Sequence, residues 1–91
     1  MSATKAIPLG DVFITQVASV TLPAPEVHAA LQRHERGDWG DCCPDDWQAN
    51  EDAITAGDRL FSVYHASDGT KFWIITEHDR SLTTVLLPED Y

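Results

Sequence analysis

The sequence predicts an α+β domain with the element order β-α-α-β-β-β, in which two helices pack on one face of a mostly antiparallel sheet. Two proline-initiated segments with helical spacing of apolar residues, both in the first half of the chain, predict the helices. The Asp68-Gly69 dipeptide between two β-rich runs predicts a hairpin that begins a C-terminal three-stranded meander. A length of 91 residues suits one domain over 1–91, in which 1–8 are expected to form a flexible N-terminal segment.

The first half of the chain should contain one strand followed by two helices. β-Branched and aromatic residues within 9–20 favour a strand over part of that segment. One helix is expected over 25–36 and a second from position 44 to position 57. Each has a proline and an acidic residue in its first turn, and a glycine marks its end.

Three strands are expected in the second half, over 59–67, 70–77 and 82–87. A two-residue Asp-Gly turn would set His65 opposite Phe72, and a four-residue loop after the second strand would set Thr76 opposite Thr83. One face of the meander is then mostly apolar and is expected to meet the helices. Its members are Phe61, Val63, His65, Phe72, Ile74, Thr76, Thr83, Val85 and Leu87.

The opposite face of the predicted sheet mixes large apolar side chains with polar ones. Its members are Leu60, Ser62, Tyr64, Ala66, Lys71, Trp73, Ile75, Glu77, Leu82, Thr84 and Leu86. Left bare, such a face would be larger than a monomer usually exposes. It could be a homodimer or partner interface, it could be covered by the N-terminal segment, or it could form a ligand groove. As an interface, it would use Tyr64, Trp73, Ile75 and Thr84.

The formal charge of −9, from 6 basic and 15 acidic residues, argues against direct nucleic-acid binding and against docking on anionic membranes. Eight acids and one base lie within 35–58, so most of the net charge falls in one turn and the second helix. The simplest interpretation is a solvated helix face. The sharper one is a patch that binds a basic protein, or that imitates a row of phosphates toward a nucleic-acid-binding protein. Its candidate residues are Asp38, Asp41, Asp45, Asp46, Glu51 and Asp52.

Few residues suggest catalysis. His34 could act as a general base, although packing against Trp39 at the helix end is the simpler interpretation. The turn that holds His78 and Arg80 could bind a phosphate or perform acid–base chemistry, or it could be an ordinary polar hairpin loop. No phosphate-binding loop, dinucleotide fingerprint or serine elbow is present, and neither a metal nor a cofactor is expected.

The two cysteines, Cys42 and Cys43, are adjacent in the sequence. Their spacing fits no zinc site, and nothing marks either thiol as activated, so we expect free thiols in a reducing compartment. The sequence has no apolar run of membrane-spanning length and no signal-peptide pattern at its start. A cytoplasmic protein is therefore expected.

The second part of the chain resembles a family of short proteins from bacterial plasmids and integrative elements, which are described only as hypothetical or plasmid-related. The resemblance covers roughly 34–91 and is looser over 9–25. It implies a bacterial mobile-element setting, in which accessory proteins often modulate host defence or maintenance, and it implies no activity. The matching segments are Gly37-Asp38-Trp39-Gly40, Ser67-Asp68-Gly69-Thr70-Lys71, Trp73-Ile74-Ile75-Thr76-Glu77, Asp79-Arg80-Ser81, Thr83-Thr84 and Leu86-Leu87-Pro88-Glu89-Asp90-Tyr91.

The element order is also similar to that of RelE-type ribonuclease toxins and their barnase-like relatives, which is an analogy of fold alone. It implies that His34, His78, Arg80 and Tyr91 could serve as catalytic groups. The leading hypothesis is nevertheless a non-enzymatic protein-binding module, and the alternative is a metal-independent ribonuclease. Six basic residues on an acidic chain are few for attracting a polyanion.

Overall fold

The structure is a computed structural model that describes residues 7–91, and it confirms the α+β class. Most of the N-terminal segment that we expected to be flexible lies outside the described residues. Ile7 is an exception to that expectation, because its side chain is buried and its backbone N–H donates to Glu35 O at 2.9 Å. The chain is therefore anchored to the domain from this residue onward.

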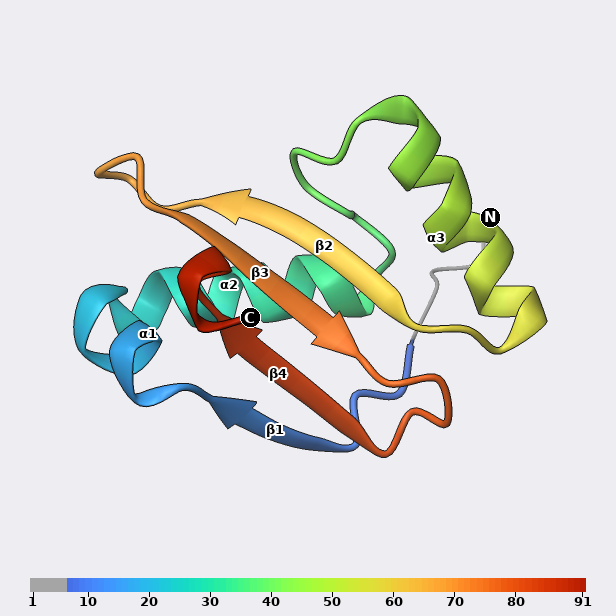
Figure 1. The fold of residues 1–91 in the computed structure, drawn as a ribbon, viewed down its shortest axis with the longest axis horizontal. Helices are drawn as coiled ribbons and strands as arrows, with labels where there is room; N and C mark the ends of the chain where they lie inside the picture. The colour runs from blue at the N-terminus through green and yellow to red at the C-terminus, as the bar shows by residue number, and fades with distance from the viewer. Residues whose placement is uncertain (1–6) are drawn as a thin grey trace.

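Four strands form one mixed sheet in the order β1-β4-β3-β2, in which β1 runs parallel to β4 and the other pairs are antiparallel (Figure 1). The elements are β1 (Asp11–Ile14), α1 (Gln16–Thr21), α2 (Ala24–Glu35), α3 (Pro44–Ala56), β2 (Leu60–His65), β3 (Lys71–Thr76), β4 (Leu82–Leu86) and the 3₁₀ turn η1 (Pro88–Asp90).

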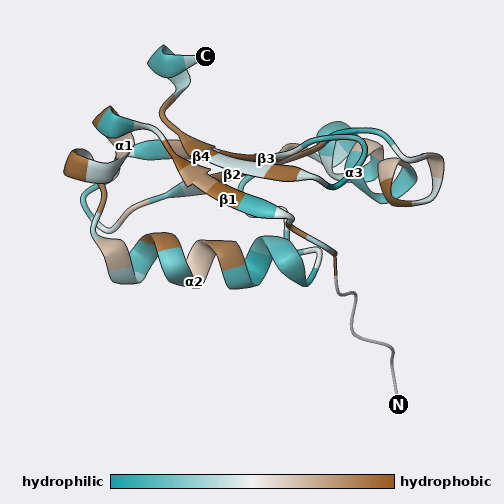
Figure 2. Cartoon of the chain, turned by 90° about the horizontal axis from the view of Figure 1, so that it is seen from below, coloured by the Kyte–Doolittle hydropathy of each residue, from teal (hydrophilic) through white to brown (hydrophobic). Residues whose placement is uncertain are grey.

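The helices do not all lie on one side of the sheet. Figure 2 shows α2 alone beneath one face, while the C-terminal turn lies on the other face. α3 lies beside β2 at one edge, and α1 follows the end of β1 (Figure 1). The expectation that both predicted helices cover the same face is therefore correct for α2 only.

The strand expected within 9–20 is only four residues long, because the rest of the segment is helical. Thr15 caps the helix α1, since its hydroxyl accepts a hydrogen bond from the N–H of Ala18 at 3.2 Å. This capping interaction ends β1 despite the β-branched residues that follow. β1 pairs with β4, where Asp11 lies opposite Leu82.

The register of the first hairpin differs by one residue from the expected one. His65 lies opposite Lys71, not Phe72, because the loop has three residues. Gly69 has φ +90°, and its N–H donates to Ala66 O at 2.8 Å. This is the geometry of a turn followed by a left-handed residue, which adds one residue to the loop. The second hairpin has the expected register, with Thr76 opposite Thr83.

The one-residue slip exchanges the two faces of β2. Leu60, Ser62 and Tyr64 face α2, while Phe61 and Val63 face the other side. The prediction that Tyr64 lies on an exposed face beside Trp73 is therefore wrong, because the Tyr64 side chain is only 2% exposed. The main core lies between the sheet and helices α1 and α2, and contains Ala18, Leu22, Val27, Ala30, Tyr64, Ala66, Phe72, Ile74, Val85 and Leu87.

Candidate functional site

His34 lies at the centre of a buried chain of hydrogen bonds that crosses the sheet. Its Nδ1 is 2.5 Å from the hydroxyl of Ser62 on β2, and its Nε2 is 2.8 Å from that of Thr76 on β3. Thr76 continues the chain to Thr83 on β4 at 2.7 Å, and Thr83 donates to Leu9 O at 2.6 Å. The chain thus connects α2 to three strands and to the segment before β1.

The last acceptor in this chain fixes the direction of every hydrogen bond in it. A carbonyl oxygen only accepts, so Thr83 donates to Leu9, Thr76 donates to Thr83, and Nε2–H of His34 donates to Thr76. Nδ1 then accepts from Ser62. Burial, helped by the positive charge of Arg80, lowers the pKa of His34 to about 4. The imidazole is therefore neutral at pH 7 and serves the fold.

The four residues considered for catalysis do not share a solvent-accessible site. His34 is fully buried and packs edge-on against Trp39, with 5.6 Å between ring centroids, which was the simpler expectation. Arg80 donates to backbone carbonyls that include Asp58 O at 2.6 Å and Ala53 O at 3.1 Å, so its guanidinium stabilises the end of α3.

The other two candidates are exposed but lie apart from the buried imidazole. His78 is in the loop between β3 and β4. Tyr91 follows the C-terminal turn on the face opposite α2, where its ring meets Trp73 edge-on at 5.7 Å and its hydroxyl accepts from Arg59 at 3.3 Å. The sheet lies between this tyrosine and His34, so one small substrate could not touch both.

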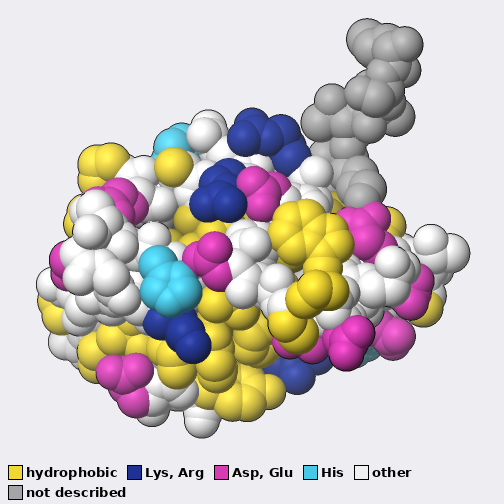
Figure 3. Space-filling view, turned by 90° about the horizontal axis from the view of Figure 1, so that it is seen from above, with side chains coloured by type: hydrophobic (Ala, Val, Ile, Leu, Met, Phe, Trp, Pro, Cys, Tyr) yellow, Lys and Arg dark blue, Asp and Glu magenta, His cyan; other side chains and the backbone are white. Residues whose placement is uncertain are grey.

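The acidic residues of the predicted patch divide into two groups. Asp38 forms an ion pair with Arg33 at 2.8 Å, and this hydrogen bond lowers the pKa of the carboxyl. Asp41 is 2.7 Å from Nδ1 of His65. Figure 3, which views the molecule from the β2 side, shows basic and acidic side chains interspersed over one part of this surface and acidic side chains gathered at the α3 end.

The second group lies on α3 and forms what we call the α3 carboxylate row: Asp45, Asp46 and Asp52. All three are exposed, and the first two lie in the first turn of the helix. Asp52 accepts a hydrogen bond from Gln48 at 3.0 Å. Because the amide of Gln48 is neutral, this bond does not compensate the negative charge of Asp52. Glu51, the remaining candidate, accepts from Nε1 of Trp39 at 2.8 Å and so helps to hold the loop before α3.

A hollow of about 240 Å³ lies next to this row and is lined by Asp46, Ala49 and Phe61. Phe61 is held there by Asn50 of α3, whose side chain accepts from Phe61 N–H at 2.9 Å and donates to Phe61 O at 2.8 Å. The Phe61 ring also packs on Trp73 with 4.8 Å between centroids. The sequence did not reveal this hollow, because the expected register placed Phe61 on the face that meets the helices, whereas the observed register places it on the opposite face.

The sheet face opposite α2 is partly covered by the chain's own C-terminal turn. Ile75 is buried, and Trp73 and Thr84 are half-buried. The expected alternatives were that the N-terminal segment, a partner or a ligand covers this face. Tyr91 instead covers part of it, since its ring packs against Trp73. Of the predicted interface residues, only Trp73 and Thr84 remain partly accessible on this face.

The remaining reactive groups do not suggest a metal or redox centre. Cys42 and Cys43 are both free thiols, and burial raises the pKa of Cys42, whose Sγ donates to Phe61 O at 3.3 Å. Within residues 7–91, no group of three or more His, Cys, Asp or Glu side chains could hold a metal ion. No helix in the same range has both the length and the apolar character needed to span a membrane.

Comparison with known proteins adds no relative to this description. No protein-family model, no curated protein and no solved structure matches the chain.

Proposed function

We propose that this chain is a small non-enzymatic protein-binding module that recognises a basic segment of a partner protein through the α3 carboxylate row. The observation that carries the proposal is the position of Asp46 beside Phe61 at the hollow next to α3. A Lys or Arg side chain entering this hollow would meet a carboxylate and an aromatic ring. Both groups attract a cation.

The distribution of charge favours this end of the molecule. Most of the net negative charge lies within 35–58, which includes α3. Such a concentration attracts basic partners and speeds their encounter. Asp38 and Asp41 contribute less, because Arg33 and His65 already lie against them.

The setting implied by the resemblance over 34–91 suggests the kind of partner. We propose a basic protein of the host or of the mobile element, such as a nucleic-acid-binding protein or a component of host defence. The carboxylates of α3 would then occupy positions that phosphates occupy in the partner's other complexes. The ribonuclease alternative gains no support from His34 and Arg80, since the first is buried and the second binds backbone carbonyls.

Titration with a labelled arginine-rich peptide tests the proposal. We expect binding that weakens steeply as salt rises, because exposed charges are screened within about 10 Å at 0.1 M. Asp46→Asn should weaken it roughly threefold to tenfold, the range for one exposed charge pair assisted by an aromatic ring. Phe61→Leu keeps an apolar side chain and should weaken binding less.

The matched control is Asp11→Asn, which removes one negative charge at the opposite edge of the sheet. The control should bind as the unaltered chain does. Equal weakening by Asp11→Asn and Asp46→Asn would show that only net charge matters and would overturn the assignment to α3. Absence of binding at low salt would overturn it as well.

A further inference from the structure

The outer side of β1 presents backbone groups that nothing in the described chain satisfies. Asp11 N–H donates to Ser81 O, and Thr15 N–H donates to Val85 O, both at 3.0 Å. Peptide groups alternate along a strand, so Phe13 also faces β4, while the N–H and C=O of Val12 and Ile14 point outward. Over residues 7–91, β1 pairs with β4 alone. In Figure 1 no other segment runs along its outer side.

The side chains around this edge are apolar and exposed. Phe13 is 56% exposed and Val20, in α1, is 80% exposed, and Val12, Ile14 and Val17 are also exposed. No charged residue occurs from 12 to 25, in a chain that is 23% charged. Proteins normally protect an edge strand with charges, proline or a covering segment. β1 itself has none of these beyond Asp11 at its first position.

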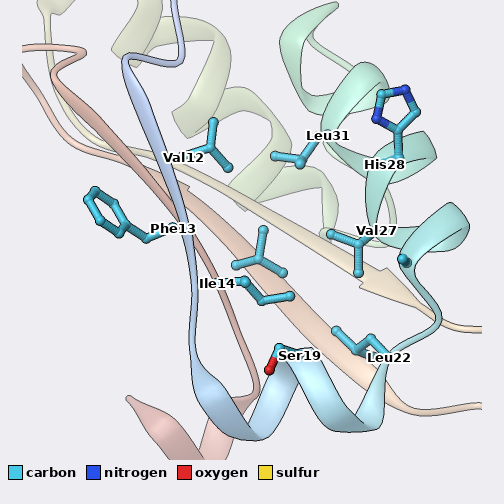
Figure 4. A pocket seen from close by; sticks show the side chains of 10 residues that line it. Val12, Phe13, Ile14, Ser19, Leu22, Val27, His28 and Leu31 are labelled. Carbon is cyan, nitrogen blue, oxygen red and sulfur yellow. The ribbon is translucent and has the colours of Figure 1, made fainter.

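An apolar groove of about 330 Å³ lies between this strand and α2. Figure 4 shows that Val12 and Ile14 point toward α2, on whose near side Val27 and Leu31 lie, whereas Phe13 points away from the groove. The two faces of β1 therefore offer different apolar surfaces. The outward N–H and C=O groups of Val12 and Ile14 lie along the edge between these two surfaces.

We propose that this edge binds a second copy of the chain, with the two β1 strands antiparallel across a two-fold axis at Phe13. In this arrangement Val12 of each copy lies opposite Ile14 of the other, so that all their outward N–H and C=O groups form hydrogen bonds. The two Phe13 residues face one another as a non-hydrogen-bonded pair, the closest kind of cross-strand pair. The two four-stranded sheets become one continuous sheet.

Charge selects a second copy as the occupant. Two chains of charge −9 repel each other, so they can associate only where the charges are remote. β1 and β2 are at opposite edges of the sheet, and the acidic α3 lies beside β2. Pairing through β1 places the two acidic ends as far apart as the sheet allows. A basic partner would find only Asp11 to pair with along this strand, whereas a second copy supplies the same uncharged apolar segment from Val12 to Ile14.

The molar mass of the chain, followed by light scattering over a range of concentrations, tests the proposal. We expect a monomer–dimer equilibrium in the unaltered chain. Phe13→Lys and Phe13→Glu should each be monomeric, because like charges would meet at the two-fold axis, and an equal mixture of the two should restore a dimer. Thr55→Lys makes the same charge change on α3 and should leave the dimer intact.

Amide hydrogen exchange separates backbone pairing from other kinds of association. In the dimer, the N–H groups of Val12 and Ile14 should exchange slowly, and in Phe13→Lys they should exchange fast, while Phe13 N–H stays bonded to β4 in the unaltered chain. A chain that stays monomeric up to about 1 mM would overturn the proposal. So would a dimer that Phe13→Lys leaves unchanged, a mixture that stays monomeric, or a dimer in which these two amides exchange fast.

Discussion

β2 and β1 are the two outer strands of the sheet, and their outer sides differ in almost every respect. The outer side of β2 is paired, because Val63 N–H donates to Trp39 O at 3.2 Å and Val63 O accepts from Asp41 N–H at 2.6 Å. Asn50 satisfies both backbone groups of the neighbouring Phe61. β1 has no such cover in the described chain and carries exposed apolar side chains.

This difference indicates that the two edges contribute to different properties of the protein, one to the stability of the monomer and the other to association. A covered edge contributes to the stability of the monomer, and substitutions there should change the free energy of unfolding. An open edge contributes little to the monomer, and substitutions there should change association. The variants below test this division, beginning with the largest expected effect.

Gly40→Ala should destabilise the covered edge most. Gly40 has φ +73°, and a Cβ there would lie 2.0 Å from Val63 O and 2.7 Å from the Tyr64 ring. Left-handed strain and overpacking together should lower the free energy of unfolding by roughly 4 kcal/mol, measured by urea denaturation. Gly57→Ala is the control, since it has φ +77° and no neighbour within 4 Å of the added carbon. A loss no larger than that of the control would contradict the tight packing of the loop on β2.

Acid should lower the stability of both edges at once, because the chain of hydrogen bonds through His34 runs from Ser62 on β2 to Leu9 before β1. The folded pKa of His34 is about 4 and its ordinary value is 6.5, so the unfolded chain binds the proton first. Stability is therefore complete above pH 6.5 and falls as the pH drops toward 4, by roughly 3 kcal/mol in total. Urea denaturation between these pH values measures the slope.

Two variants assign that slope to His34. His34→Gln should remove this part of the pH dependence, although the variant is less stable at pH 7 because the network is disturbed. His78→Gln alters an exposed histidine and should retain it. If both variants kept the full slope, another group would be responsible for the acid sensitivity.

Asn50→Ala should cost less than either of these changes. It leaves the N–H and C=O of Phe61 without their side-chain partner in a partly buried place. We expect a loss of about 2 kcal/mol in the free energy of unfolding. Gln48→Ala, on an exposed position of the same helix, should cost less than about 0.5 kcal/mol. Equal losses would mean that the amide of Asn50 does not seal this edge.

Phe13→Lys should have the smallest effect on the monomer, within about 0.5 kcal/mol, because the ring is exposed. The measurement is urea denaturation at a concentration low enough to keep the chain monomeric. A much larger loss would show that β1 stabilises the monomer, and the contrast between the two edges would fail.

The elements set by local interactions were predictable from the sequence. α3 begins at Pro44 and ends before Gly57, whose φ of +77° is the left-handed conformation that terminates a helix. The first hairpin was recognisable, but not its register. An Asp-Gly pair fits loops of two or three residues, and Asp68 Oδ1 accepting from Thr70 N–H at 3.0 Å accompanies the longer one.

The candidate site was less predictable, because long-range contacts determine it. The acidic residues were identifiable by composition. Which of them contact another side chain depends on Arg33 and His65, which are brought to Asp38 and Asp41 by the packing of α2 and β2. The position of Phe61 depended on the register, and the open edge depended on the pairing of β1 with β4 alone among the strands of residues 7–91.

The parallel pairing of β1 with β4 also bears on the order of folding. The segment that forms β1 has no strand to join until residues 82–86, some seventy positions later, have taken their place. Closing so long a loop is slow, so β1 should be the last strand to enter the sheet and the first to leave it. Its uncharged apolar sequence is accessible during that interval. Newly made or partly unfolded molecules should therefore aggregate through 12–20 first, and a Lys in that stretch should protect them even where it has no effect on the finished fold.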